Sequence, residues 1–101
     1  MYLKRERPRF LTISLLDSDE WGHLKDYQNY VATLKTYDMW IENIIQTLTQ
    51  MGDYGRNTTL IVTTDHGRGS GSDWGEHGYL KGDWRIWMWV YGTPLNQVQC
   101  L

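Results

Sequence analysis

Residues 58–67 of this 101-residue chain read TTLIVTTDHG, a run of aliphatic and β-branched residues that stops at Asp65, His66 and Gly67. A short apolar run with a polar end predicts a buried strand over residues 58–64. Adjacent strand residues point to opposite faces of a sheet, so Asp65 and His66 can serve one site only if the chain turns there. Gly67 permits that turn.

Two other stretches have the same character. Residues 10–16 read FLTISLL and run into the polar residues 17–19, and residues 85–91 read RIWMWVY and end at residues 92–94, Gly-Thr-Pro. Both are predicted to be strands. Ligands of open α/β sheets bind at the carboxyl ends of the strands, so we expect the polar residues there to form the functional site.

Residues 26–51, between the first two predicted strands, have the apolar spacing of one helix face. Asp26 is suited to cap the start of this helix and Gly52 its end. A strand–helix–strand order with apolar strands implies parallel pairing. We therefore expect an α/β fold with a short, mostly parallel sheet and one long helix. The residues on the apolar face are Tyr27, Tyr30, Val31, Leu34, Tyr37, Ile41, Ile44, Ile45 and Leu48.

The composition excludes several classes of function. The formal net charge is −2, so the chain lacks a broad basic surface for the phosphates of nucleic acids. The one basic cluster, Lys4, Arg5, Arg7 and Arg9, is predicted to be a solvated end. No apolar run approaches the about 18 residues of a membrane helix. The single cysteine, Cys100, excludes an internal disulfide and does not suggest a cysteine-based metal site.

Each of the three histidines has a carboxylate nearby in the sequence. His23 follows Asp19 by four residues, a spacing that places both side chains on one face of a helix. His66 directly follows Asp65 at the end of a predicted strand. His77 lies in the glycine-rich segment beyond it, where the chain can fold back over the strand ends. The three histidines are therefore candidate metal ligands.

Mixed aspartate and histidine ligands suit zinc, manganese or iron. Two such ions about 3.5–4 Å apart can activate a nucleophile and stabilise a phosphoryl group. A lone histidine is more often an ordinary surface or core residue, and a D-x-x-x-H spacing alone occurs by chance in many chains. Three histidines beside carboxylates, at predicted strand ends, favour the metal interpretation.

The motifs together resemble a known family. The strings LLDSDEWGH, TTLIVTTDHGRG and WGEHG, with IWMWVYGTP behind them, resemble the C-terminal half of the catalytic domain of the alkaline phosphatase/sulfatase superfamily. That superfamily includes phosphatases, nucleotide phosphodiesterases, cofactor-independent phosphoglycerate mutases and sulfatases. The resemblance implies a partial alkaline-phosphatase-like domain over residues 10–95, preceded by a basic segment at 1–9 and followed by a tail at 96–101.

By position, the resemblance implies two metal sites. Asp19, His23 and His77 would bind one divalent ion, and Asp65 with His66 would bind the other. Zinc is expected, with manganese as the alternative. Histidine ligands suit transition metals better than the oxygen-only calcium site usual in sulfatases, which favours a phosphatase or phosphodiesterase.

Four other polar residues flank these ligands. Asp17 is a fallback for Asp19, although its spacing does not fit the D-x-x-x-H motif. Asp73 and Glu76 are expected outside the ligand set, near the site or in solvent. Arg68 has two interpretations that the sequence leaves open, an approach to an anionic substrate or a solvated position in the loop.

The Ser or Thr nucleophile of the superfamily has no counterpart here, since residues 1–9 contain no Ser, Thr or Asp. We therefore expect a metal-dependent hydrolase of phosphate esters by ancestry, with a small phosphorylated substrate, at most one ion and little turnover in this chain. The alternative is a non-enzymatic, self-associating fragment with vestigial metal ligands. A short sheet with bare edges also predicts a homo-oligomer or association with a missing N-terminal half.

Overall fold

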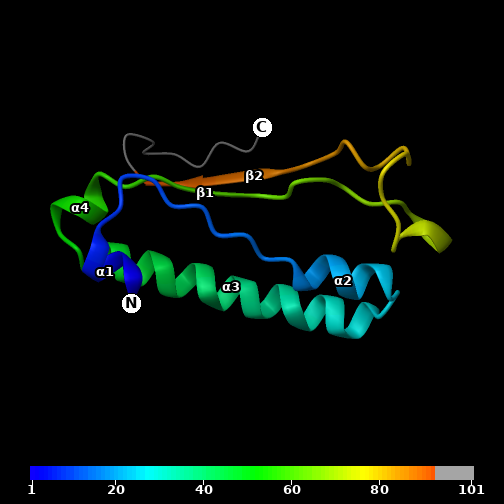
Figure 1. The fold of residues 1–101 in the computed structure, drawn as a ribbon, viewed down its shortest axis with the longest axis horizontal. Helices are drawn as coiled ribbons and strands as arrows, with labels where there is room; N and C mark the ends of the chain where they lie inside the picture. The colour runs from blue at the N-terminus through cyan, green and yellow to red at the C-terminus, as the bar shows by residue number, and fades with distance from the viewer. Residues whose placement is uncertain (93–101) are drawn as a thin grey trace.

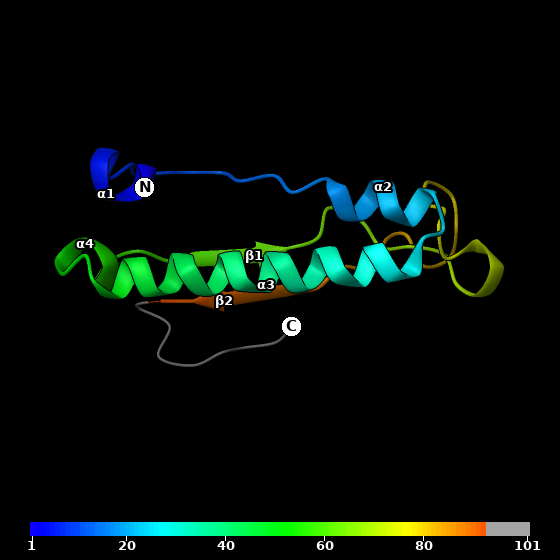
Figure 2. The ribbon, with the colours of Figure 1, turned by 90° about the horizontal axis from the view of Figure 1, so that it is seen from below.

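The computed structural model describes residues 1–92. Its principal extents are 48 × 27 × 18 Å, because one long helix runs the length of one side and the strands lie along the other (Figure 1). α1 and α4 lie at one end of this elongated body, and α2 and η1 lie at the other (Figures 1 and 2). In chain order the elements are α1 (Tyr2–Glu6), α2 (Asp17–His23), α3 (Tyr27–Thr49), α4 (Asp53–Arg56), β1 (Leu60–Thr63), the short 3₁₀ helix η1 (Gly71–Asp73) and β2 (Met88–Tyr91).

The long helix α3 confirms the helix predicted over residues 26–51. Asp26 caps its start, since Oδ1 of Asp26 accepts a hydrogen bond of 3.0 Å from the backbone N–H of Asn29. The side-chain amide of Asn29 donates a second bond, of 2.8 Å, to Oδ2. These bonds, the backbone one foremost, lower the pKa of Asp26 because they stabilise the carboxylate. Tyr37 and Leu48 are the buried hydrophobic residues of α3.

α3 ends at Thr49, and Gln50 is its C-cap residue. Gly52 follows two residues after Gln50 and has a φ of 60°. This positive φ, which glycine adopts at little cost, turns the chain into α4. The predicted end of the long helix is therefore close to the observed one. The short helix α4 was not predicted.

α2 packs against α3 at the far end of the molecule. The backbone N–H of Ser18 donates a hydrogen bond of 3.3 Å to the hydroxyl of Tyr37, which ties the start of α2 to the middle of α3. The chain reverses between the two helices through Lys25, whose φ is 55°. Asp19 and His23 lie on α2, as the helical interpretation of their spacing predicts.

The sheet is two-stranded and antiparallel, with Leu60 opposite Tyr91 and Thr63 opposite Met88. The strands predicted over residues 58–64 and 85–91 are present as β1 and β2, but both are shorter than predicted. β1 is only half-buried, with Ile61 exposed. The prediction of a mostly parallel sheet is wrong for residues 1–92. Parallel strands need a crossover connection, whereas the loop after β1 folds over one end of the molecule and returns the chain along the same strand.

The predicted strand at residues 10–16 is extended but belongs to no sheet in the described part of the chain. It runs between α1 and α2 and is displaced from β1 (Figure 2). Its apolar side chains are exposed, Phe10 by 86% and Leu16 by 65%. The prediction of a buried strand is therefore wrong here, because neither a neighbouring strand nor a packed layer covers the segment within residues 1–92.

The predicted basic end, residues 1–9, contains the helix α1. Leu3 is buried, and Nζ of Lys4 donates a hydrogen bond of 3.2 Å to Oε1 of Gln50 at the end of α3. The prediction of a merely solvated end was therefore incomplete. No helix within residues 1–92 is long and apolar enough to cross a membrane. Cys100 and the predicted tail at 96–101 lie outside the described residues.

Candidate metal centre

Three segments meet at the end of the molecule where α2 ends. The first is α2, which carries Asp19 and His23 one helical turn apart. Oδ2 of Asp19 lies 3.4 Å from Nε2 of His23. The second is the stretch directly after β1, with Asp65 and His66. The third is the glycine-rich loop, residues 67–82, which carries His77.

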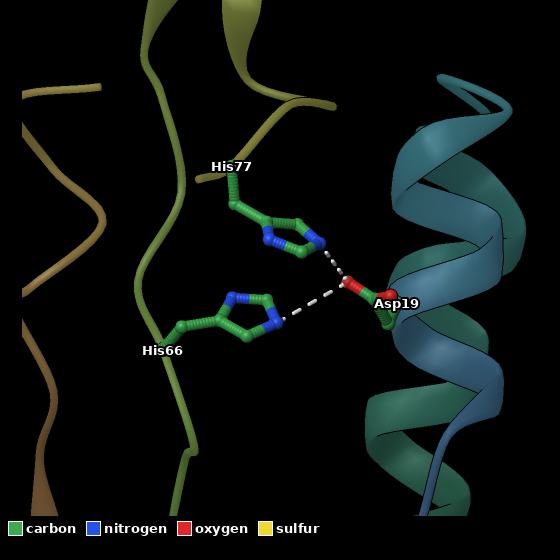
Figure 3. Close-up of side chains that lie close together, drawn as sticks. All are labelled: Asp19, His66 and His77. Carbon is green, nitrogen blue, oxygen red and sulfur yellow. Dashed lines mark ion pairs between the residues drawn. The ribbon is translucent and has the colours of Figure 1, made fainter. Parts of the chain in front are cut away.

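Asp19 lies at the centre of the cluster. Its Oδ1 atom is 3.4 Å from Nε2 of His77 and 3.7 Å from Nε2 of His66 (Figure 3). One ligand atom from each of these three residues lies within 4.8 Å of the other two. All three side chains are partly buried. The three residues of this group come from three segments: α2, the stretch after β1 and the glycine-rich loop.

The ring of His66 is oriented by its own backbone. Nδ1 lies 2.8 Å from the carbonyl oxygen of Gly67, which can only accept, so Nδ1 carries the proton. Nε2 then faces Asp19 with a free lone pair in the neutral ring. Histidines that bind metals commonly donate their second N–H to a carbonyl in this way, because the bond selects the tautomer that leaves the other nitrogen available.

His77 contacts both of the other histidines. Its Nε2 is 2.9 Å from Nε2 of His23, and its ring is stacked on His66 with centroids 3.8 Å apart and planes inclined by 22°. Asp65 stands at the margin, with a side chain 84% exposed and Oδ2 3.7 Å from Nε2 of His66. The five residues predicted as ligands thus form one connected cluster. The predicted division between two ions stays a prediction.

Asp83 holds the glycine-rich loop closed, a role that sequence reasoning missed. Oδ2 of Asp83 accepts hydrogen bonds from the backbone N–H groups of Gly78, at 2.6 Å, and Leu80, at 2.5 Å. Its backbone carbonyl accepts another from the N–H of Gly67, at 2.6 Å. Gly67 directly follows His66, and Gly78 directly follows His77. These bonds therefore let one residue, Asp83, hold the backbone beside both histidines.

Gly67 is required by close packing and not by its backbone angles. A Cβ atom there would lie 2.1 Å from the carbonyl oxygen of Gly82 and 2.6 Å from that of Arg85. The predicted turn after Asp65 is therefore a close crossing of two backbone segments, which no larger residue permits.

Trp74 anchors the loop on the start of α3. Its ring meets the rings of Tyr27 and Tyr30 edge-on, with both centroid distances at 5.7 Å. Nζ of Lys25 adds a hydrogen bond of 3.0 Å to the carbonyl oxygen of Ser72. A tryptophan inside a loop of small and polar residues was the available sequence signal for this anchor, but its partners could not be identified from the sequence.

Arg68 points inward, and its side chain is only 15% exposed. Nη2 donates to Oδ1 of Asp19 and, at 3.1 Å, to the backbone carbonyl of the same residue. Nη1 donates to the carbonyl of Gly75 at 3.0 Å, and the guanidinium lies 6.0 Å from the ring centroid of Tyr30. The solvated position considered for Arg68 is therefore wrong, and the guanidinium is engaged with a predicted metal ligand.

The remaining acidic residues lie outside this group. Asp17, the fallback for Asp19, begins α2 and is exposed, and it does not belong to the group that Asp19 forms with His66 and His77. Asp73 and Glu76 are also exposed. Neither belongs to the group of partly buried ligand atoms formed within the described chain by Asp19, His66 and His77.

The donor set fits a tetrahedral transition metal. Two atoms that each lie about 2.0–2.1 Å from a tetrahedral zinc are about 3.3 Å apart. The separations of 3.4 and 3.7 Å from Oδ1 of Asp19 to His77 and His66 are close to that value. One carboxylate and two imidazoles are also ligands that zinc, manganese and iron accept. Three protein ligands are also the number that holds a catalytic zinc, whose fourth position stays open.

A family model described as the metalloenzyme superfamily matches residues 2–77. The match covers most of the chain and contains Asp19, His23, Asp65 and His66, ending on His77. Comparisons with curated proteins and with solved structures give no match. The chain therefore belongs to the metalloenzyme superfamily, a member of the alkaline phosphatase-like fold clan.

Proposed function

We propose that this chain binds one divalent transition metal through Asp19, His66 and His77, with zinc as the preferred ion. The observation that carries this proposal is the convergence of their ligand atoms within 4.8 Å, from three separate segments of the chain. The membership of a metalloenzyme family supports it. His23 and Asp65 border the group and would adjust its charge and geometry.

We propose hydrolysis of phosphate esters as the chemistry that this site serves. A bound divalent ion supplies Lewis acidity, which polarises a phosphoryl oxygen. The chain's own residues would hold the positive charge of the ion in place. Asp19 supplies the negative charge, and the bond from Nδ1 of His66 to the carbonyl of Gly67 keeps the other ring nitrogen directed at Asp19. Histidine ligands support a phosphatase or phosphodiesterase over a calcium-dependent sulfatase.

Zinc titration of the metal-free chain, followed by calorimetry, tests the binding proposal. We expect one equivalent of zinc to bind, and we expect Asp19→Asn, His66→Ala and His77→Ala each to weaken it. Asp17→Asn is the matched control, because Asp17 lies on the same helix outside the group. Binding that is equal in His77→Ala and in the parent chain would contradict the proposal.

Hydrolysis of an aryl phosphate by the zinc-loaded chain tests the chemistry separately. We expect any turnover to require zinc and to disappear in His77→Ala while Asp17→Asn retains it. Zinc binding without turnover would leave the metal site standing and remove phosphate-ester hydrolysis as the function of this chain alone.

We propose self-association as a second function, favoured by the exposed apolar surface. Phe10, Ile13 and Leu16 on the extended segment are exposed, as are Trp84 and Trp87 before β2. Bare strand edges and apolar segments of this kind promote pairing between copies. Sedimentation velocity should show a dimer or larger species that Phe10→Ser combined with Leu16→Ser weakens. A parent chain that is monomeric at its highest soluble concentration would exclude this function.

A further inference from the structure

Arg68 and the two histidines converge on a single oxygen atom. Oδ1 of Asp19 accepts a hydrogen bond from Nη2 of Arg68 and lies 3.4 Å from Nε2 of His77 and 3.7 Å from Nε2 of His66. It is therefore the carboxylate atom placed to bind the proposed metal, and a permanent cation already occupies one of its acceptor positions. Guanidinium groups do not lose their charge in proteins.

Gly22 makes room for this cation on α2. A Cβ atom at Gly22 would lie 2.5 Å from Cζ of Arg68, 2.6 Å from Nη1 and 2.7 Å from Nη2. Glycine is a poor helix former, yet any larger residue at this buried position in α2 would meet the guanidinium. The backbone carbonyls of Asp19 and Gly75 complete the surroundings of Arg68. The position is thus shaped for the guanidinium on several sides.

We propose that Arg68 is an internal cation that competes with the metal for Oδ1 of Asp19 and so lowers the affinity of the site. This inference rests on the proposed metal site. Without an ion, the guanidinium neutralises a partly buried carboxylate, which would otherwise be costly to leave unpaired. With an ion, two positive charges share one oxygen, and their mutual repulsion weakens the hold on the metal. The proposed site would therefore hold its ion less tightly than the same ligands would without Arg68.

The test compares zinc affinities, measured by competition with a chromophoric chelator, for the parent chain, Arg68→Met and Arg68→Lys. We expect Arg68→Met, which keeps much of the side-chain length but removes the charge, to bind zinc on the order of tenfold more tightly. Arg68→Lys retains the charge and should stay near the parent value. An affinity in Arg68→Met that is unchanged or weaker, or an equal gain in Arg68→Lys, overturns the proposal.

Gly22→Ala gives an independent test that keeps the net charge and the arginine. The atoms that its Cβ would meet belong to the far end of a flexible side chain, so we expect Arg68 to move off Asp19 while α2 persists. Zinc binding should again be tighter than in the parent chain. A purely structural role for Arg68 predicts weaker binding instead. Circular dichroism checks that each variant is folded, and Gly22→Ala decides the matter if Arg68→Met does not fold.

The pattern of results separates this inference from the proposed function. Zinc binding by the parent chain that weakens in Arg68→Met supports the metal site and overturns the competition. Zinc binding by Arg68→Met alone supports the competition and shows that the parent chain is not itself a metal-binding protein. Absence of binding in the parent chain, Arg68→Met and Gly22→Ala overturns both.

Discussion

The Nε2 atoms of His23 and His77 lie 2.9 Å apart, although 54 residues separate them in the chain. At this distance one ring must donate a proton and the other must accept it. Because Nε2 of His77 is also a ligand atom of the proposed metal site, it cannot bond to His23 and to an ion at once, so metal binding would require this contact to open.

His77→Ala is expected to weaken zinc binding more than His23→Ala does. His77 belongs to the closest group of ligand atoms, with Asp19 and His66, whereas the side chain of His23 is more exposed and lies at its border. Loss of a direct ligand should cost about 100-fold or more in affinity, because even residues that only orient ligands cost about 10–100-fold. Calorimetric zinc titration measures the zinc affinity of each variant. Equal losses in the two variants would instead support the division of ligands predicted from the sequence, in which His23 and His77 share one ion.

Trp74→Ala is expected to weaken zinc binding about tenfold or more and to lower the stability of the chain by about 2 kcal/mol. Trp74 packs edge-on against Tyr27 and Tyr30, and this packing holds the loop that carries His77. Chemical denaturation and zinc titration measure the two effects. Trp84→Ala is the matched control, since the side chain of Trp84 is largely exposed. Comparable effects in the two variants would contradict the anchoring role.

Gly67→Ala is expected to destabilise the fold by about 2–4 kcal/mol. The new Cβ would lie 2.1 Å from the backbone oxygen of Gly82, and backbone cannot move aside as a side chain can. Gly71→Ala is the control. Gly71 has a φ of 60° but faces open space, so it should cost only about 1–2 kcal/mol of backbone strain. Thermal unfolding of both variants checks the order, and a more severe effect at Gly71 would contradict the close crossing.

Asp26→Asn is expected to alter how stability depends on pH. Hydrogen bonds from Asn29, the backbone one foremost, lower the pKa of Asp26 below its ordinary value of 3.8. A carboxylate with a lowered folded-state pKa adds stability above the ordinary pKa, and that stability is lost as the pH falls through the folded pKa. Asparagine caps helices without a charge. The parent chain should therefore exceed Asp26→Asn in melting temperature near neutral pH, and the difference should disappear in strong acid.

Asp38→Asn serves as the control for that measurement, because Asp38 lies on the exposed surface of the same helix and does not cap it. A difference between the parent chain and Asp26→Asn that stays constant from neutral to acidic pH would show that the charge of Asp26 does not act through the helix cap.

Features that depend on neighbouring residues could be predicted from the order of residues alone. α3 follows from the apolar repeat and from the Asp26 cap, since both act within a few residues along the chain. The spacing of Asp19 and His23 predicts that they lie one helical turn apart, and they do so in α2. These are local patterns, and the metal-binding chemistry that they indicate agrees with the match to a metalloenzyme family over residues 2–77.

Features that depend on distant parts of the chain could not be predicted, because packing between separate segments fixes them. Residues 10–16 have the composition of a buried strand, but a strand needs a neighbour, and none of the described residues pairs with them. The direction of pairing between β1 and β2 was set by the return of the loop between them. Arg68 could be placed against Asp19 only once α2 and the loop were packed together, because Gly22 opens that space from another segment. A hydrogen-bond partner across the fold is chosen by packing, which local sequence does not encode.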